Sequence, residues 1–189
     1  MTASTLAFTP GDVLRTEPRP GYWGCAVILS AARKTTEFHP RFHVGVTPAV
    51  FRHEFDFSEI DASRLTILRF SRDVRTEPGT YVARGTETCI GIYTAKSRGD
   101  LFVLGKVDPL SVYASPLTLE VGDGTNGSFP LCGPLRKNIG VEAVIAWRRI
   151  HDAETLSREV IDARESFEAM EAERLAKQRE RSKRKRGNA

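Results

Sequence analysis

Residues 8–29 read FTPGDVLRTEPRPGYWGCAVIL, and the rest of the chain is interpreted as an extension of this stretch. Its Pro-Gly-Asp sequence at positions 10–12 is a turn signal that leads into a short extended run. Pro18 and Pro20 lack the N–H that a strand ladder needs, so we expect no central strand between them. Gly21 then permits a tight reversal of the chain.

Residues 22–29 are aromatic, apolar and β-branched, which predicts a strand that is buried on both faces. Gly24 within it indicates a bulge or a close approach of another backbone segment. The segment 50–61 alternates aromatic and acidic residues with period two, which predicts an extended piece with one face in water. Further strands are predicted at residues 42–46, 65–70, 81–84, 88–93, 101–107, 117–121 and 141–149.

Asp152 is placed to cap a helix that runs from Ala153 to about Arg181. The helix carries a narrow apolar stripe with 4-3-4-3 spacing, made of Leu156, Val160, Ala163, Phe167 and Met170. We therefore expect a β-rich domain over residues 1–152 and a C-terminal helix that docks through residue 170. Residues 171–189 are expected to form a basic tail that frays.

These elements predict a mainly β protein of the α+β class. Its strands are expected to form an antiparallel, partly open SH3-like barrel or a curved sheet, with one long C-terminal helix.

The charge of the chain is concentrated at its end. Residues 171–189 carry eight Lys or Arg and three Glu, whereas the net charge of all 189 residues is only +4. The folded body is thus close to neutral, and the basic character belongs to the tail. Three cysteines without a CxxC pair fit a reducing compartment, and neither a leader pattern nor a run of ~20 apolar residues is evident. We expect a soluble, cytoplasmic protein.

No constellation of residues indicates catalysis, a metal or a cofactor. The GxGxxG string at residues 122–127 is followed by Ser-Phe-Pro, which cannot begin the helix that a dinucleotide site needs. His39 and His43 are four apart, but Pro40 lies between them, and neither they nor His53 has a completing ligand set nearby. We expect no catalytic residues, no metal site and no cofactor, and hence no enzyme.

Four carboxylates form the candidate partner-binding site, and only Arg52 lies near them in sequence: Glu54, Asp56, Glu59 and Asp61. A solvated face is one reading of this segment. The other is a docking surface for a basic partner, since complementary charge would speed the encounter of the two proteins.

The basic tail gives four candidate nucleic-acid contacts: Lys183, Arg184, Lys185 and Arg186. Such a run can hold phosphates by charge alone, but it lacks the aromatic residues that stack on single strands. A solvated helix end is the alternative, since basic residues are favourable near a helix C-terminus.

The opening stretch resembles the immunity protein 26 family of bacterial polymorphic toxin systems. The resemblance rests on Gly11-Asp12-Val13, a Pro-containing corner, and Gly21-Tyr22-Trp23-Gly24 followed by apolar residues 25–29. The sequence FPLCGP at residues 129–134 is similar to the distal aromatic–apolar–glycine element of that family. The resemblance covers about residues 8–147, and the long basic helix is not part of the family pattern.

The resemblance implies a cytoplasmic, β-rich, non-catalytic protein that binds and blocks a cognate toxin. Many such toxins attack nucleic acid and are basic at their active surface, which an acidic segment would suit. Gly11, Asp12, Gly21 and Gly24 are then structural residues that set turns and strand approach. The alternative function is a nucleic-acid-binding module that combines an SH3-like barrel with the basic helix.

Overall fold

The computed structural model describes residues 7–32, 41–70, 73–77, 80–83, 87–94, 97–114 and 135–187. Two compact units make up the chain: Met1–Asp73 with Ala83–Trp147, and Val74–Val82 with Arg148–Ala189. The strands of the described residues are β1 (Asp12–Arg19), β2 (Tyr22–Ala32), β3 (Arg41–Phe51), β4 (Arg69–Phe70), β5 (Asp73–Glu77), β6 (Thr80–Ala83), β7 (Glu87–Thr88), β8 (Ile90–Thr94) and β9 (Phe102–Lys106). The helices are the 3-10 turns η1 (Phe57–Glu59) and η2 (Ala62–Arg64), and α1 (Pro109–Val112), α2 (Leu135–Asn138), α3 (Val141–His151) and α4 (Ala153–Gly187).

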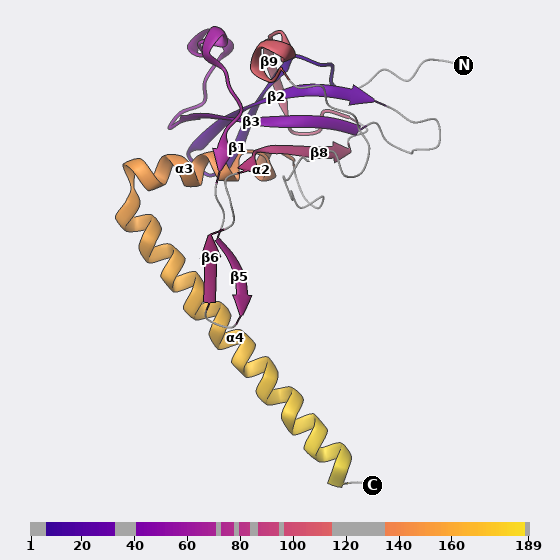
Figure 1. The fold of residues 1–189 in the computed structure, drawn as a ribbon, viewed down its shortest axis with the longest axis vertical. Helices are drawn as coiled ribbons and strands as arrows, with labels where there is room; N and C mark the ends of the chain where they lie inside the picture. Colours follow the sequence, from indigo (N-terminus) through magenta and orange to yellow (C-terminus); the bar gives the residue numbers. More distant parts are fainter. Residues whose placement is uncertain are drawn as a thin grey trace, which may run out of the picture. The chain divides into compact units, whose positions relative to one another are not determined.

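The first unit is built on a five-stranded sheet with the order β8-β3-β2-β1-β9 (Figure 1). Every pair of neighbours in it is antiparallel, and β8 and β9 form its two edges, so the sheet is open. This arrangement confirms the predicted fold class: mainly β within α+β, with an open antiparallel sheet and a long C-terminal helix.

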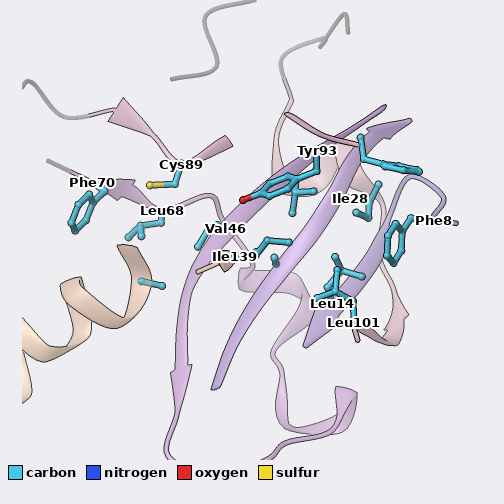
Figure 2. Packing of buried hydrophobic residues seen from close by; sticks show 14 residues of the cluster. Phe8, Leu14, Ile28, Val46, Leu68, Phe70, Cys89, Tyr93, Leu101 and Ile139 are labelled. Atoms are coloured by element: carbon cyan, nitrogen blue, oxygen red, sulfur yellow. The ribbon is translucent and has the colours of Figure 1, made fainter. Parts of the chain in front are cut away.

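Strand β2 is buried on both faces, as its sequence predicts. Because neighbouring side chains of a strand point to opposite faces, Ala26 and Ile28 enter one core cluster, while Cys25 and Val27 enter another. Figure 2 shows the first cluster, to which Ile139 also contributes. The second cluster receives side chains from the segments that follow β3 and β9: Phe55, Leu65 and Val112.

The prolines inside β1 and β3 lie where the ladder is already interrupted. The pairing of β1 with β9 ends at Arg15, and its register with β2 shifts between Thr16 and Arg19, on either side of Pro18. Strand β3 passes Pro48 and ends at Phe51, so the predicted strand at 42–46 was too short. It can do so because the register of β3 with β2 shifts between Val46 and Val50, on either side of Pro48, and β8 pairs with β3 only as far as Gly45.

The extended piece predicted at residues 50–61 is wrong beyond the end of β3. The Asp56 N–H donates to the Glu59 carboxylate at the start of η1, and the Asp61 carboxylate accepts from the Ser63 N–H at the start of η2, so the side chains of Glu59 and Asp61 favour short helical turns over a strand. The strand predicted at 65–70 is reduced to β4, which pairs with β7. The predicted element at 117–121 and the loop at 122–127 lie outside the described residues.

The strand predicted at residues 141–149 is also wrong, since this segment forms α3. Ala143 is buried in the first cluster and Ala146 packs against it, a spacing of three that is helical, while Ile139 enters the same cluster from the turn before the helix. Short apolar runs do not distinguish a strand from a buried helix. The chain enters α3 through Gly140, whose φ is +95°.

Helix α4 begins at Ala153, as predicted, and continues to Gly187. In the second unit, the buried Arg148 donates hydrogen bonds to Asp152 and Glu159 at the start of this helix. The exposed fractions of Val160, Phe167 and Met170 are 39%, 47% and 63%. Docking of the helix through residue 170, and the domain boundary after residue 152, stay predictions. None of the helices within the described residues is both long and apolar enough to span a membrane.

Candidate functional site

The acidic segment forms a loop over residues 53–61, here called the acidic loop, that one buried aromatic holds against the sheet. Phe55 is 1% exposed and belongs to the second core cluster. Its ring stacks on Phe51 at the end of β3, with ring centroids 4.0 Å apart. The residues on either side of it face water: the side chains of Glu54 and Asp56 are 56% and 84% exposed.

A buried arginine from β1 fixes the same loop. The side chain of Arg15 is 9% exposed, and its Nη1 donates a hydrogen bond of 2.8 Å to the carbonyl oxygen of Phe55. Its guanidinium forms an ion pair with Glu54 and lies 3.8 Å from the Asp56 carboxylate. No sequence pattern predicts this contact, because Arg15 precedes Phe55 by 40 residues and only the packing of the fold brings them together.

Two guanidinium groups lie close to the ring of Trp23 in β2. That of Arg15 is 5.5 Å from its ring centroid, and that of Arg136, from α2, is 4.8 Å away. Arg136 also forms a 2.8 Å ion pair with Glu17. The ring centroid of Phe102 in β9 lies 5.0 Å from the Arg15 guanidinium, and Phe102 is 56% exposed. An exposed aromatic ring therefore borders the outward carboxylates of the acidic loop.

The remaining two carboxylates of the acidic loop also shape its backbone. Glu59 accepts hydrogen bonds of 2.9 Å from the Asp56 N–H and of 2.9 Å from His53 Nε2. These two contacts, that of His53 foremost, hold the pKa of Glu59 below its usual 4.5. Asp61 accepts from the N–H and the hydroxyl of Ser63 at 3.2 and 2.6 Å. The structure thus gathers all four predicted residues on one loop and gives two of them capping roles.

A pocket of about 340 Å³ opens beside the acidic loop, and sequence reasoning missed it. It lies between the end of β3 and the η1–η2 segment. Apolar side chains and two carboxylates line it, among them Phe51, Ile60, Leu65, Glu59 and Asp61, together with the cation Arg64. No periodicity in the sequence indicates this concavity, since it forms where β3 continues past its proline.

The glycines of the opening motif lie in the turn before β1, in the turn between β1 and β2, and at the bulge of β2. Gly11 has a φ of +89°, and a Cβ there would lie 2.2 Å from the Val107 carbonyl oxygen. Gly21 has a φ of +74° with open space around it. A Cβ on Gly24 would lie 2.9 Å from Thr16 Oγ1, at the bulge of β2.

Asp12, the fourth residue of that motif, is 5% exposed and closes the turn before β1. Its carboxylate accepts hydrogen bonds of 2.8 and 2.9 Å from the N–H and the hydroxyl of Thr9.

His43 and Cys25 are buried in the sheet. His43 is buried in β3, and its Nδ1 is hydrogen-bonded to Ser30 Oγ at 2.7 Å. Burial raises the pKa of the Cys25 thiol to about 12, so it is not a nucleophile at neutral pH. Within the described part of the chain, no three His, Cys, Asp or Glu side chains are grouped to hold a metal ion.

Three predicted features have no described side chains. The structure describes only the backbone of four basic residues in α4: Lys183, Arg184, Lys185 and Arg186. His39 and the FPLCGP sequence at 129–134 lie outside the described residues altogether.

Comparisons with known proteins identify no relative. No family model, no curated protein and no solved structure matches the chain.

Proposed function

We propose that this chain is an immunity protein that binds a cognate bacterial toxin and blocks it without catalysis. The proposal begins from the resemblance of residues 8–29 to the immunity protein 26 family. The observation that carries it is the acidic loop, in which Glu54 and Asp56 are exposed but anchored by Arg15 and Phe55.

Rigid anchoring makes these carboxylates suitable for binding a basic surface. A loop that is already ordered loses little conformational entropy when a partner docks. Outward carboxylates attract a basic partner over the Debye length and select against acidic ones. Phe102, half-exposed beside them, supplies the apolar contact that interfaces place next to their charged groups.

The inhibition follows from occlusion. A toxin that attacks nucleic acid needs a basic surface to hold phosphates. In this proposal the acidic loop occupies that surface in place of the phosphates. The toxin is then inhibited without any covalent change to its catalytic groups. The protein requires no catalytic residue or cofactor of its own for this role.

Co-expression with the toxins encoded beside this gene tests the function. The wild-type chain should restore growth with one of them. The double variant Glu54→Lys, Asp56→Lys should bind that toxin about a hundredfold more weakly, at about tenfold per reversed charge, because like charges then face each other. The matched control Glu165→Lys, Glu168→Lys makes the same charge change on exposed positions of α4 and should bind as the wild type does.

The immunity function and the acidic loop as its binding site can be rejected by different results. Failure of the wild-type chain with every neighbouring toxin rejects the immunity function. Rescue and affinity that survive the reversal at Glu54 and Asp56 reject the acidic loop as the binding site.

A nucleic-acid-binding module is the second candidate, favoured by the continuation of α4 to Gly187. The helix includes four consecutive basic residues on one continuous helical backbone: Lys183, Arg184, Lys185 and Arg186. Deleting residues 171–189 should abolish binding to DNA or RNA and remove its salt dependence. Absence of binding by the full chain at low salt would eliminate this candidate.

A further inference from the structure

The pocket beside the acidic loop is large enough to admit one long side chain. Its volume of about 340 Å³ lies at the lower end of the roughly 300–1,000 Å³ of small-molecule sites. It shares Glu59 and Asp61 with the acidic loop, so a protein bound to the loop would also reach the pocket.

The lining of the pocket combines apolar walls with carboxylates. Phe51, Ile60 and Leu65 supply the apolar surface, and Glu59 and Asp61 supply two negative charges against the single cation Arg64. Both hydrogen bonds from Ser63 go to Oδ1 of Asp61, and no hydrogen bond to Oδ2 is present among the described residues. A side chain with a long apolar stem and a cationic head matches this lining.

An arginine matches it better than a lysine. The planar guanidinium offers several N–H donors in a fixed fork, which suits two neighbouring carboxylates, and it stacks on aromatic rings such as that of Phe51. Hydrogen bonds from His53 and the Asp56 N–H stabilise the Glu59 carboxylate and hold its pKa below the usual range. The charge needed to hold a guanidinium is therefore present at neutral pH.

We infer that this pocket receives one arginine side chain of the partner protein, as an anchor of the interface. The identity of that partner as a toxin rests on the proposed function, whereas the preference of the pocket for a guanidinium can be measured without it.

A titration of the full chain with small probes tests the pocket directly. The probe is N-acetyl-arginine amide, and N-acetyl-citrulline amide is the matched control, since it has nearly the same shape and no charge. Amide NMR shifts of Ile60, Asp61 and Leu65 should move and saturate with the arginine probe and stay in place with the citrulline probe. Equal shifts with both probes, no shifts at the pocket, or tighter binding of N-acetyl-lysine amide would overturn the inference.

Two substitutions in the lining should change the affinity in opposite directions. Asp61→Asn should weaken binding of the arginine probe about tenfold, while asparagine still caps η2. Arg64→Gln removes the cation that repels the probe and should strengthen binding several-fold. Asp108→Asn makes the same change at the N-cap of α1, away from the pocket, and should have no effect. A uniform effect of all three variants would contradict a specific guanidinium site.

The toxin experiment distinguishes failure of the arginine pocket, called the socket below, from failure of the proposed immunity function. If the toxin binds and depends on Glu54 and Asp56 but not on Asp61, the socket is rejected and the proposed function stands. If the arginine probe binds at the pocket and no neighbouring toxin is bound, the proposed function is rejected and the socket stands.

Discussion

Replacing Arg15 by methionine should detach the acidic loop from the sheet. Methionine keeps most of the apolar stem of Arg15 on β1 but removes the guanidinium that joins Phe55, Glu54 and Asp56. The carboxylates of Glu54 and Asp56 are more than half exposed, so the substitution leaves no buried charge without a partner. The main loss is the donor to the Phe55 carbonyl oxygen.

The expected destabilisation is the sum of three contributions. The hydrogen bond from the charged Arg15 to Phe55 is worth about 1.5–3 kcal/mol. The ion pair with Glu54 adds about 0.5 kcal/mol or less, because the carboxylate is 56% exposed and screened by solvent. Contacts with the rings of Trp23 and Phe102 add about 0.5–1 kcal/mol between them. We expect a loss of about 3 kcal/mol, or a fall in Tm of about 6–12 °C for a chain of this length.

Arg136→Met is the matched control, since Arg136 also contacts Trp23 and pairs with a glutamate. Its ion pair with Glu17 is about one-quarter exposed on each side, and its guanidinium holds no loop, so the loss should be about 1 kcal/mol.

Urea unfolding gives both values, and hydrogen exchange of the amides at residues 53–61 reports the loop itself. Equal destabilisation by Arg15→Met and Arg136→Met, or unchanged exchange of the loop in Arg15→Met, would refute this account.

Two further predictions concern the turn glycines and the pH dependence of stability. Gly11→Ala combines a φ of +89° with a 2.2 Å approach to the Val107 carbonyl oxygen and should cost about 3 kcal/mol or more, whereas Gly21→Ala, with a φ of +74° in open space, should cost about 1–2 kcal/mol. Equal losses in thermal unfolding of the two variants would contradict this difference. Glu59→Gln should destabilise the protein at pH 7, and the difference from the wild type should vanish as the pH falls below 4.5 and through the lowered folded pKa. The sign follows because a carboxylate with a lowered folded pKa stabilises only while it is ionised, so a difference that persists in strong acid would oppose the role of the His53 contact.

Local sequence signals sufficed for the hairpin that begins the fold and for its two-sided burial. Proline fixes φ and glycine permits a positive φ wherever they occur, so the turn before Tyr22 could be placed without knowledge of any partner strand. The unbroken run of apolar side chains along residues 25–29 required cover on both faces of the sheet, and two core clusters supply it. The capping signal of Asp152 likewise sufficed to place the start of α4.

Tertiary structure alone decided the rest. The run at 141–149 is helical because Ala143 and Ala146 meet the first core cluster with helical spacing, and the same residues in isolation are equally suited to a strand. The site shows the same division: the carboxylates of the acidic loop are visible in the sequence, but the guanidinium of Arg15 that holds them is 40 residues away from Phe55. Composition and periodicity act over a few residues, whereas a buried ion pair or a pocket depends on which strands lie side by side.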